Sequence, residues 1–187
     1  MRIAVLMLAI MQLMHVRAAE IVPAAEPGIT VCIDEGFRLF EMGLARALTS
    51  TIYSKIGTEI KWGCPGDPEQ AMVVTIRADP RDVRHPGALG YAQPFTGHIR
   101  VFYDRLGRFS PELRVNLLAH VLAHEIAHVL EGTDRHSQNG IMKAHWDSFD
   151  FGKMMTHHLE FTAEDVVLIR RGIAARHLAR PMFASLR

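Results

Sequence analysis

The sequence predicts an α/β (α+β) protein with elements in the order strand, helix, three strands, helix, loop, helix. Short β-branched runs alternate with longer segments of helical periodicity, and glycine and proline separate them. No internal repeat or low-complexity linker interrupts the chain. A length of 187 residues, 49% of them hydrophobic, is sufficient for one hydrophobic core. This composition excludes a wholly disordered chain, a collagen-like repeat and a polytopic membrane protein.

The first half of the chain is predicted to form a strand, a helix and two further strands. Ile29–Ile33 is a short β-branched run and is expected as a buried strand. Asp34 is expected to cap a helix over Gly36–Lys55, in which apolar residues recur at three- and four-residue steps. Thr58–Trp62 and Ala71–Arg77 are the second and third expected strands, because both combine alternation with β-branched residues.

The second half is predicted to form one more strand and two helices. Residues 78–97 are broken by prolines and glycines and are interpreted as loop, whereas His98–Tyr103 alternates and is the fourth expected strand. Ser110 caps a long helix over Pro111–Glu131, with proline in the favoured first helical position. A threonine caps the last helix, which is expected over Ala163–Ala179.

The first 19 residues have the layout of a secretory signal peptide. A positive start precedes the almost unbroken apolar run Ile3–Met14, and Ala18 and Ala19 are small residues suited to cleavage. The run is shorter than the about 20 residues that a membrane span needs, so an anchor is the weaker alternative, as is a buried N-terminal helix. We therefore expect a signal peptide at 1–19, one mature domain at 20–187, and a secreted or periplasmic protein without stable membrane association.

The charge balance argues against a nucleic-acid partner. The chain has 21 Lys and Arg against 20 Asp and Glu, a formal net charge of +1. Removal of residues 1–19 would take Arg2 and Arg17 away and leave 19 basic against 20 acidic residues, a net charge of −1. Nucleic-acid binding usually requires a clearly basic face, so we expect none.

Cys32 and Cys64 are the two cysteines of the chain. An even number of cysteines in an exported protein indicates a disulfide, because export leads to an oxidising compartment. A closed loop of about 30 residues would stabilise the fold by roughly 3 to 4 kcal/mol in the chain-entropy account. Two buried free thiols are the alternative. Neither cysteine lies in a CxxC pair, so neither indicates a zinc or redox motif.

The long helix contains the sequence HExxH, formed by His124, Glu125 and His128. Four residues are close to one helical turn, so both imidazoles project from one face and can share a metal ion. Neutral imidazole suits Zn²⁺, and a third protein ligand and a water molecule complete an open catalytic site. Glu125 is then placed to act as general base and acid. His120, one turn earlier, is expected beside the site or at the surface.

The third ligand must come from the residues after the helix. Gly132 lets the helix stop and the chain reverse, which makes His136 the first choice. Asp134 is the near alternative, because a carboxylate oxygen also binds zinc. Glu160 or Glu164 would instead suit a gluzincin-type site, in which a glutamate from a later helix is the third ligand.

These residues resemble the metzincins, and the matrixin branch in particular, whose motif HExxHxxGxxH is followed by a methionine turn beneath the zinc. The matching residues are His124, Glu125, His128, Gly132, His136-Ser137 and Gly140-Ile141-Met142. Leu89–Ala92 and Gly97–Phe102 are similar to the segment that forms the edge strand above the cleft, and Phe161–Ile169 is similar to the start of the last matrixin helix. The resemblance covers roughly residues 29–178.

The chain departs from the family pattern at the third ligand. Gly132 follows His128 by four residues instead of three, and the position of the third histidine holds Asp134. Either the turn is two residues longer and His136 is the ligand, or Asp134 is the ligand, as in an aspartate variant of the motif. The serine after His136 and the number of residues from His136 to the methionine favour His136. The number of residues that follow His128 favours Asp134.

The resemblance implies a twisted, mixed, mostly parallel sheet of four to five strands with three main helices. It further implies a secreted zinc metalloendopeptidase with one Zn²⁺ on His124, His128 and His136, and with Glu125 as general base. Met142 is then the hydrophobic floor beneath the zinc.

A peptide or protein substrate would lie extended against the Gly97–Tyr103 strand, and the enzyme is expected to be a monomer. A zinc-binding domain without hydrolytic activity, and an interaction domain in which HExxH is accidental, are the alternatives.

Overall fold

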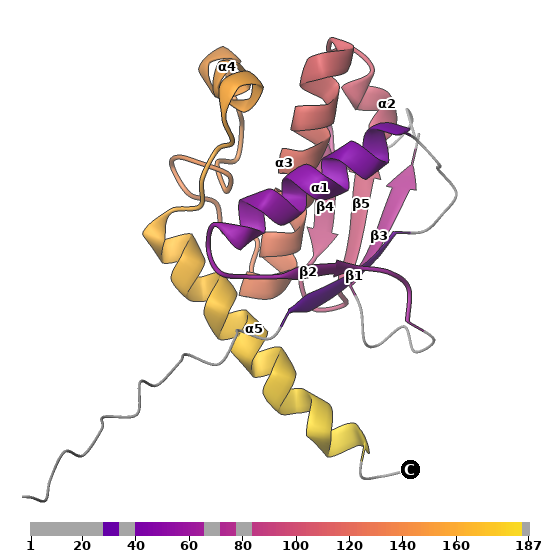
Figure 1. Cartoon of the computed structure of the whole chain (residues 1–187), viewed down its shortest axis with the longest axis vertical. Coiled ribbons are helices and arrows are strands. Elements are labelled where there is room, and N and C mark those ends of the chain that lie inside the picture. Colours follow the sequence, from indigo (N-terminus) through magenta and orange to yellow (C-terminus); the bar gives the residue numbers. More distant parts are fainter. Residues whose placement is uncertain (1–27, 34–39, 66–71, 78–83, 185–187) are drawn as a thin grey trace, which may run out of the picture.

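The structure is a computed structural model that describes residues 28–33, 40–65, 72–77 and 84–184. Its strands are β1 (Ile29–Ile33), β2 (Ile60–Trp62), β3 (Met72–Arg77), β4 (Gly90–Gln93) and β5 (His98–Phe102). Its helices are α1 (Phe40–Ser54), α2 (Tyr103–Leu106), α3 (Pro111–Glu131), α4 (Ser148–Thr156) and α5 (Ala163–Ala184). Figure 1 shows α1 and α3 in front of the sheet, with α5 crossing below them.

The strands form one sheet in the order β2-β1-β3-β5-β4. The pairs β1–β2, β1–β3 and β3–β5 are parallel, and β4 is the one strand of the described residues that runs antiparallel to its neighbour, β5. The predicted α/β class with a mixed, mostly parallel sheet is therefore confirmed. The signal peptide expected at 1–19, the Asp34 cap and the helix start at Gly36 lie outside the described residues.

Two elements were not predicted from periodicity. β4 lies within residues 78–97, which the prolines and glycines of that segment suggested were loop, and it forms the edge of the sheet. Helix α4 lies between the long helix and the last one, and a capping box between Asp147 and Asp150 begins it. β4 has only four residues, too few for a periodic pattern, and α4 has nine residues with a glycine among them.

Helix α3 is the central element of the fold. Ser110 accepts a hydrogen bond from Leu113 N at 3.4 Å at its start, and Gly132 ends it in the left-handed conformation with φ of 68°. Every residue from Leu117 to Leu130 is buried, so over almost four turns little of the helix surface is exposed to solvent. The residues that resemble a zinc motif thus lie on the most deeply packed segment of the chain.

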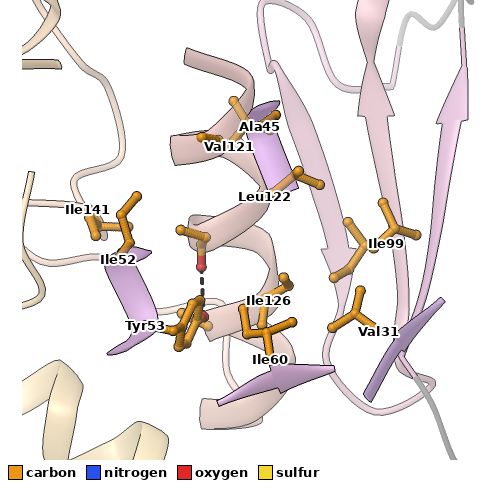
Figure 2. Close-up of a cluster of buried hydrophobic side chains, with 14 of the residues drawn as sticks. Val31, Ala45, Ile52, Tyr53, Ile60, Ile99, Val121, Leu122, Ile126 and Ile141 are labelled. Carbon is orange, nitrogen blue, oxygen red and sulfur yellow. Dashed lines mark hydrogen bonds between the residues drawn. The ribbon is translucent and has the colours of Figure 1, made fainter. Parts of the chain in front are cut away.

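Helix α1 packs across α3 with both apolar and polar contacts (Figure 2). Tyr53 Oη donates a hydrogen bond to Ala123 O at 2.9 Å, and Thr49 Oγ1 donates to Ala119 O at 3.1 Å. Both side chains are fully buried, so these bonds satisfy groups that would otherwise be costly to bury. They also fix the register of α1 against the turn of α3 that precedes His124.

Two further contacts join elements outside the α1–α3 packing. A disulfide joins Cys32 of β1 to Cys64, just after β2, so the predicted pairing is present in the structure. Helix α5 crosses α3 at Gly172, where an added Cβ atom would overlap the carbonyl oxygen of Leu130. Among the described helices, none is both long enough and apolar enough to cross a membrane.

Candidate metal centre

His124 and His128 project from one face of α3, one turn apart, as the HExxH spacing predicts. Each ring is fixed by a backbone carbonyl: His124 Nδ1 lies 2.7 Å from Ile141 O, and His128 Nδ1 lies 3.0 Å from Thr133 O. A carbonyl oxygen can only accept a hydrogen bond, so each Nδ1 must carry the proton of its ring. The Nε2 atoms then bear lone pairs, and these two atoms face each other at 3.0 Å.

His136 joins this pair from the turn that follows the helix. Its imidazole offers a nitrogen that lies within 4.8 Å of the ligand nitrogens of His124 and His128. The ring centroids of His136 and His128 are 4.9 Å apart, and those of His136 and His124 are 5.3 Å apart. His136 is exposed, whereas the two helix histidines are buried. Asp134 is also exposed and lines the same cleft, but it is not part of this group.

The two buried histidines are neutral at pH 7. Burial, together with the neighbouring imidazoles, lowers the pKa of His124 to about 3 and the pKa of His128 to about 4. A metal ion requires neutral imidazole, so their protonation state suits a ligand role. Two facing lone pairs at 3.0 Å repel each other, and a bound cation would convert this repulsion into attraction.

Glu125 lies beside the histidine group and beneath the edge strand. The carboxylate accepts a hydrogen bond from the backbone N–H of Ala92, and Gly90 lies so close that a Cβ there would be 2.6 Å from Glu125 Oε1. Burial raises the pKa of Glu125 to about 8, while the N–H of Ala92 acts in the opposite direction. The group is thus able to gain and lose a proton near neutral pH.

The segment after His136 folds back beneath the histidines. Ser137 N donates to Met142 O at 2.7 Å, Gly140 has φ of 75°, and Ile141 N donates to Glu160 O at 3.0 Å. Ile141 O in turn accepts from His124. Met142 is fully buried, in agreement with an apolar position below the group, while its role as a floor beneath a zinc ion stays a prediction.

The histidine group opens into a cleft of about 640 Å³. Its walls include β4 and the preceding loop on one side and the segment Lys143–Trp146 on the other. The Trp146 ring lies 5.6 Å from that of His124 and its Nε1 donates to Gly140 O at 3.3 Å, so Trp146 is a fixed wall of the cleft.

The expectation that a substrate pairs with the Gly97–Tyr103 strand is wrong. β5, which occupies this segment, is already hydrogen-bonded to β3 on one side and to β4 on the other. β4 is the outermost strand of the sheet and borders the cleft. The prediction failed because β4, the strand that pairs with the edge of β5, could not be recognised from the periodicity of its own short sequence.

Several sequence-predicted candidates lie elsewhere. Glu160 is 75% exposed with an ion pair to Lys55, and Glu164 is 71% exposed near Arg135, so neither lies with the histidine pair as a gluzincin-type site requires. His120 is fully buried and does not lie at the surface. Its Nδ1 lies 2.7 Å from Asn116 O, and its Nε2 accepts a hydrogen bond from Leu159 N at 3.0 Å.

Asp165 was missed as a contributor to the site. Its carboxylate binds Arg135 and Ser137, the two neighbours of His136 in sequence. From the sequence, only its place in the first turn of the last helix could be predicted. Its contacts could not, because the partners are 28 and 30 residues away in the chain.

The comparisons with known proteins bear on the fold. No protein-family model matches the sequence, and no curated protein matches it. Among solved structures, the chain is similar to archaemetzincin from Methanopyrus kandleri, with a TM-score of 0.57 and 18% sequence identity. The match covers 82% of this chain and 99% of that one. The fold is therefore metzincin-like, as the sequence predicted, while the narrower resemblance to matrixins stays a prediction.

Proposed function

We propose that the protein is a secreted or periplasmic zinc-dependent metalloendopeptidase that acts as a monomer on peptide or protein substrates. The observation that carries this proposal is the group of three imidazoles with Glu125 beside it. Two unprotonated Nε2 atoms face each other at 3.0 Å, and a nitrogen of His136 lies within 4.8 Å of the ligand atoms of both. The metzincin-like fold, shared with the archaeal archaemetzincin, supports the same class.

The donor set fits zinc. Three imidazole nitrogens and an open cleft correspond to a catalytic site with three protein ligands and one free position. Nitrogens bound to one zinc at about 2.0–2.1 Å in a tetrahedron lie about 3.3 Å apart, close to the separation of the two Nε2 atoms. A bound zinc ion supplies Lewis-acid polarisation of a carbonyl group and of a water molecule.

Glu125 is the general base and acid of the proposed reaction. Its carboxylate accepts the proton that the attacking water loses, and the same oxygen delivers it to the nitrogen of the leaving amine. The N–H of Ala92 and the close backbone of Gly90 hold the carboxylate in one orientation. A raised pKa favours this role, because the group must be a strong enough base to take the proton and then release it.

The substrate would lie along β4. An extended peptide can pair with the free edge of an outermost strand, and here that strand borders the cleft that contains the histidines. Pairing at this edge would hold the scissile bond beside Glu125, whose carboxylate bonds to Ala92 of the same strand.

Export is proposed from the N-terminal sequence. The apolar run and the small residues before position 20 are typical of a signal peptide, and the Cys32–Cys64 disulfide suits an oxidising compartment. N-terminal sequencing of the exported protein tests this part. A mature chain that begins at Glu20 is expected, and a retained Met1 would contradict it.

The catalytic part is tested with wild type and Glu125→Gln, prepared identically. Elemental analysis should find about one zinc per chain in both proteins, and peptide cleavage should be lost only in the variant, by about 10²- to 10⁴-fold. His136→Ala and Asp134→Ala provide the ligand test: His136→Ala should bind zinc much more weakly and be purified with far less than one zinc per chain, whereas Asp134→Ala should keep about one. A wild type that takes up no zinc would contradict a metal site, and one that binds zinc without cleaving any peptide would indicate a binding domain.

A further inference from the structure

The third imidazole of the histidine group depends on a turn for its position. His124 and His128 are held by helix α3 and by backbone carbonyls, but His136 is exposed and follows the helix by five residues. The turn is also two residues longer than in the metzincin pattern. A longer turn has more conformations available, so an anchor is needed if His136 is to occupy one place.

Such an anchor is present on both sides of His136. Arg135 Nη2 donates to Asp165 Oδ1 at 2.6 Å, and Ser137 Oγ donates to the same oxygen at 2.6 Å. Arg135 Nη1 also donates to Ser137 Oγ at 3.1 Å, which closes a ring of three hydrogen bonds around the residue between them. The two flanking residues are thereby tied to one atom of helix α5.

Asp165 is itself held rigidly. It is fully buried in the first turn of α5, and its other oxygen accepts a hydrogen bond from Thr162 N at 2.8 Å. Charge-assisted hydrogen bonds of a buried carboxylate are short and strong, so the anchor restricts the turn more than exposed ion pairs do. Glu164 offers a comparison: its Oε2 is 3.7 Å from Arg135 Nη1, but its side chain is 71% exposed.

We propose that Asp165 is the positioning residue for His136, and that it sets the metal affinity of the site through Arg135 and Ser137. This inference rests on the proposed zinc site and adds to it a determinant in a different helix. The buried carboxylate holds the residues before and after His136, so the imidazole is presented to the ion before the ion binds. Groups that hydrogen-bond directly to a metal ligand typically change metal affinity by about 10- to 100-fold when they are replaced, and we expect an effect of the same order from a carboxylate that holds both neighbours of a ligand.

The experiment measures zinc affinity by competition with a chromophoric chelator. Asp165→Asn should bind zinc about 10- to 100-fold more weakly than wild type. Because Asp165 also caps α5, Ser137→Ala and Arg135→Met are included, since they remove the turn side of the anchor and leave the Thr162 contact intact. Both of these substitutions should also weaken zinc binding, as Asp165→Asn does. Glu164→Gln is the matched control and should stay within about twofold of wild type.

The same substitution in a His136→Ala background separates positioning from general stability. If Asp165 acts through His136, Asp165→Asn should change the remaining zinc affinity by less than about twofold once His136 is absent. An equal loss in both backgrounds would overturn the inference, as would wild-type affinity in all three anchor variants. Absence of zinc binding by wild type would overturn the proposed function together with this inference, whereas tight binding unaffected by the anchor variants would overturn the inference alone.

Discussion

The carboxylate of Glu125 lies directly against the backbone of Gly90, the first residue of the edge strand β4. A Cβ atom on Gly90 would be 2.6 Å from Glu125 Oε1 and 2.9 Å from its carboxyl carbon, distances at which one of the two groups must move. The residue proposed as general base and the strand proposed to bind substrate are therefore in contact. A side chain at position 90 would occupy the space of the carboxylate, so Glu125 would have to shift.

We predict that Gly90→Ala lowers kcat/KM for peptide cleavage by about 10- to 100-fold, since a shift of about 1 Å in a catalytic group has this effect. Zinc content should be unchanged, because no ligand is moved. Gly43→Ala in α1 is the control, since an added Cβ there meets nothing within 4 Å. Equal activity in both variants would show that Glu125 can move aside without consequence.

The buried His120 gives a pH-dependent contribution to stability. Burial lowers its pKa to about 4 from 6.5, with smaller contributions from His158 and Lys55. The unfolded chain therefore binds the proton more readily, and the folded state should lose up to about 3 kcal/mol of stability as the pH falls from 6.5 to 4. Above pH 6.5 this loss is absent.

The comparison of wild type with His120→Gln isolates this contribution, because the amide oxygen can still accept the hydrogen bond from Leu159 N. In urea unfolding with a chelator present, the free energy of unfolding of the variant should fall less steeply between pH 6.5 and 4. His157→Gln, at an exposed position, should follow wild type. Parallel curves for wild type and His120→Gln would contradict the prediction.

The crossing of α3 and α5 at Gly172 should not accept a side chain. An added methyl group would overlap the carbonyl oxygen of Leu130, and neither backbone can shift without separating the helices. We expect Gly172→Ala to destabilise the protein by about 1–3 kcal/mol in thermal or urea unfolding, despite the helix propensity of alanine. Gly152→Ala in α4, where an added Cβ meets nothing within 4 Å, should be neutral or stabilising. A neutral Gly172→Ala would mean that the helices lie further apart.

The parts of the fold that periodicity predicted are those with long patterns. α3 has a serine cap, a proline at its first position and a glycine after its end, and all three behave in the structure as the sequence indicated. β4 has four residues and only Ala92 is buried, so nothing in GYAQ distinguishes an edge strand from a loop. Its place was suggested by resemblance alone.

In the candidate site, too, one part could be predicted from local sequence and another could not. His124, Glu125 and His128 follow from one helical turn, and the chain brings His136 to them. The contacts that orient these side chains could not be predicted, because Ile141, Leu159 and Asp165 approach only in the folded chain. Sequence spacing thus indicates the donors, while their orientation depends on contacts between distant segments.

The complete burial of α3 from Leu117 to Leu130 has a consequence for how the site opens. Amide hydrogens in such a helix exchange with solvent only when the whole domain unfolds, whereas those of an exposed turn exchange through local opening. The amides of His124 and His128 should then be among the slowest to exchange, and that of His136 among the faster ones. Two of the three imidazoles would keep their places for as long as the domain is folded, whereas the place of the third would last only as long as the hydrogen bonds of Arg135 and Ser137 to Asp165.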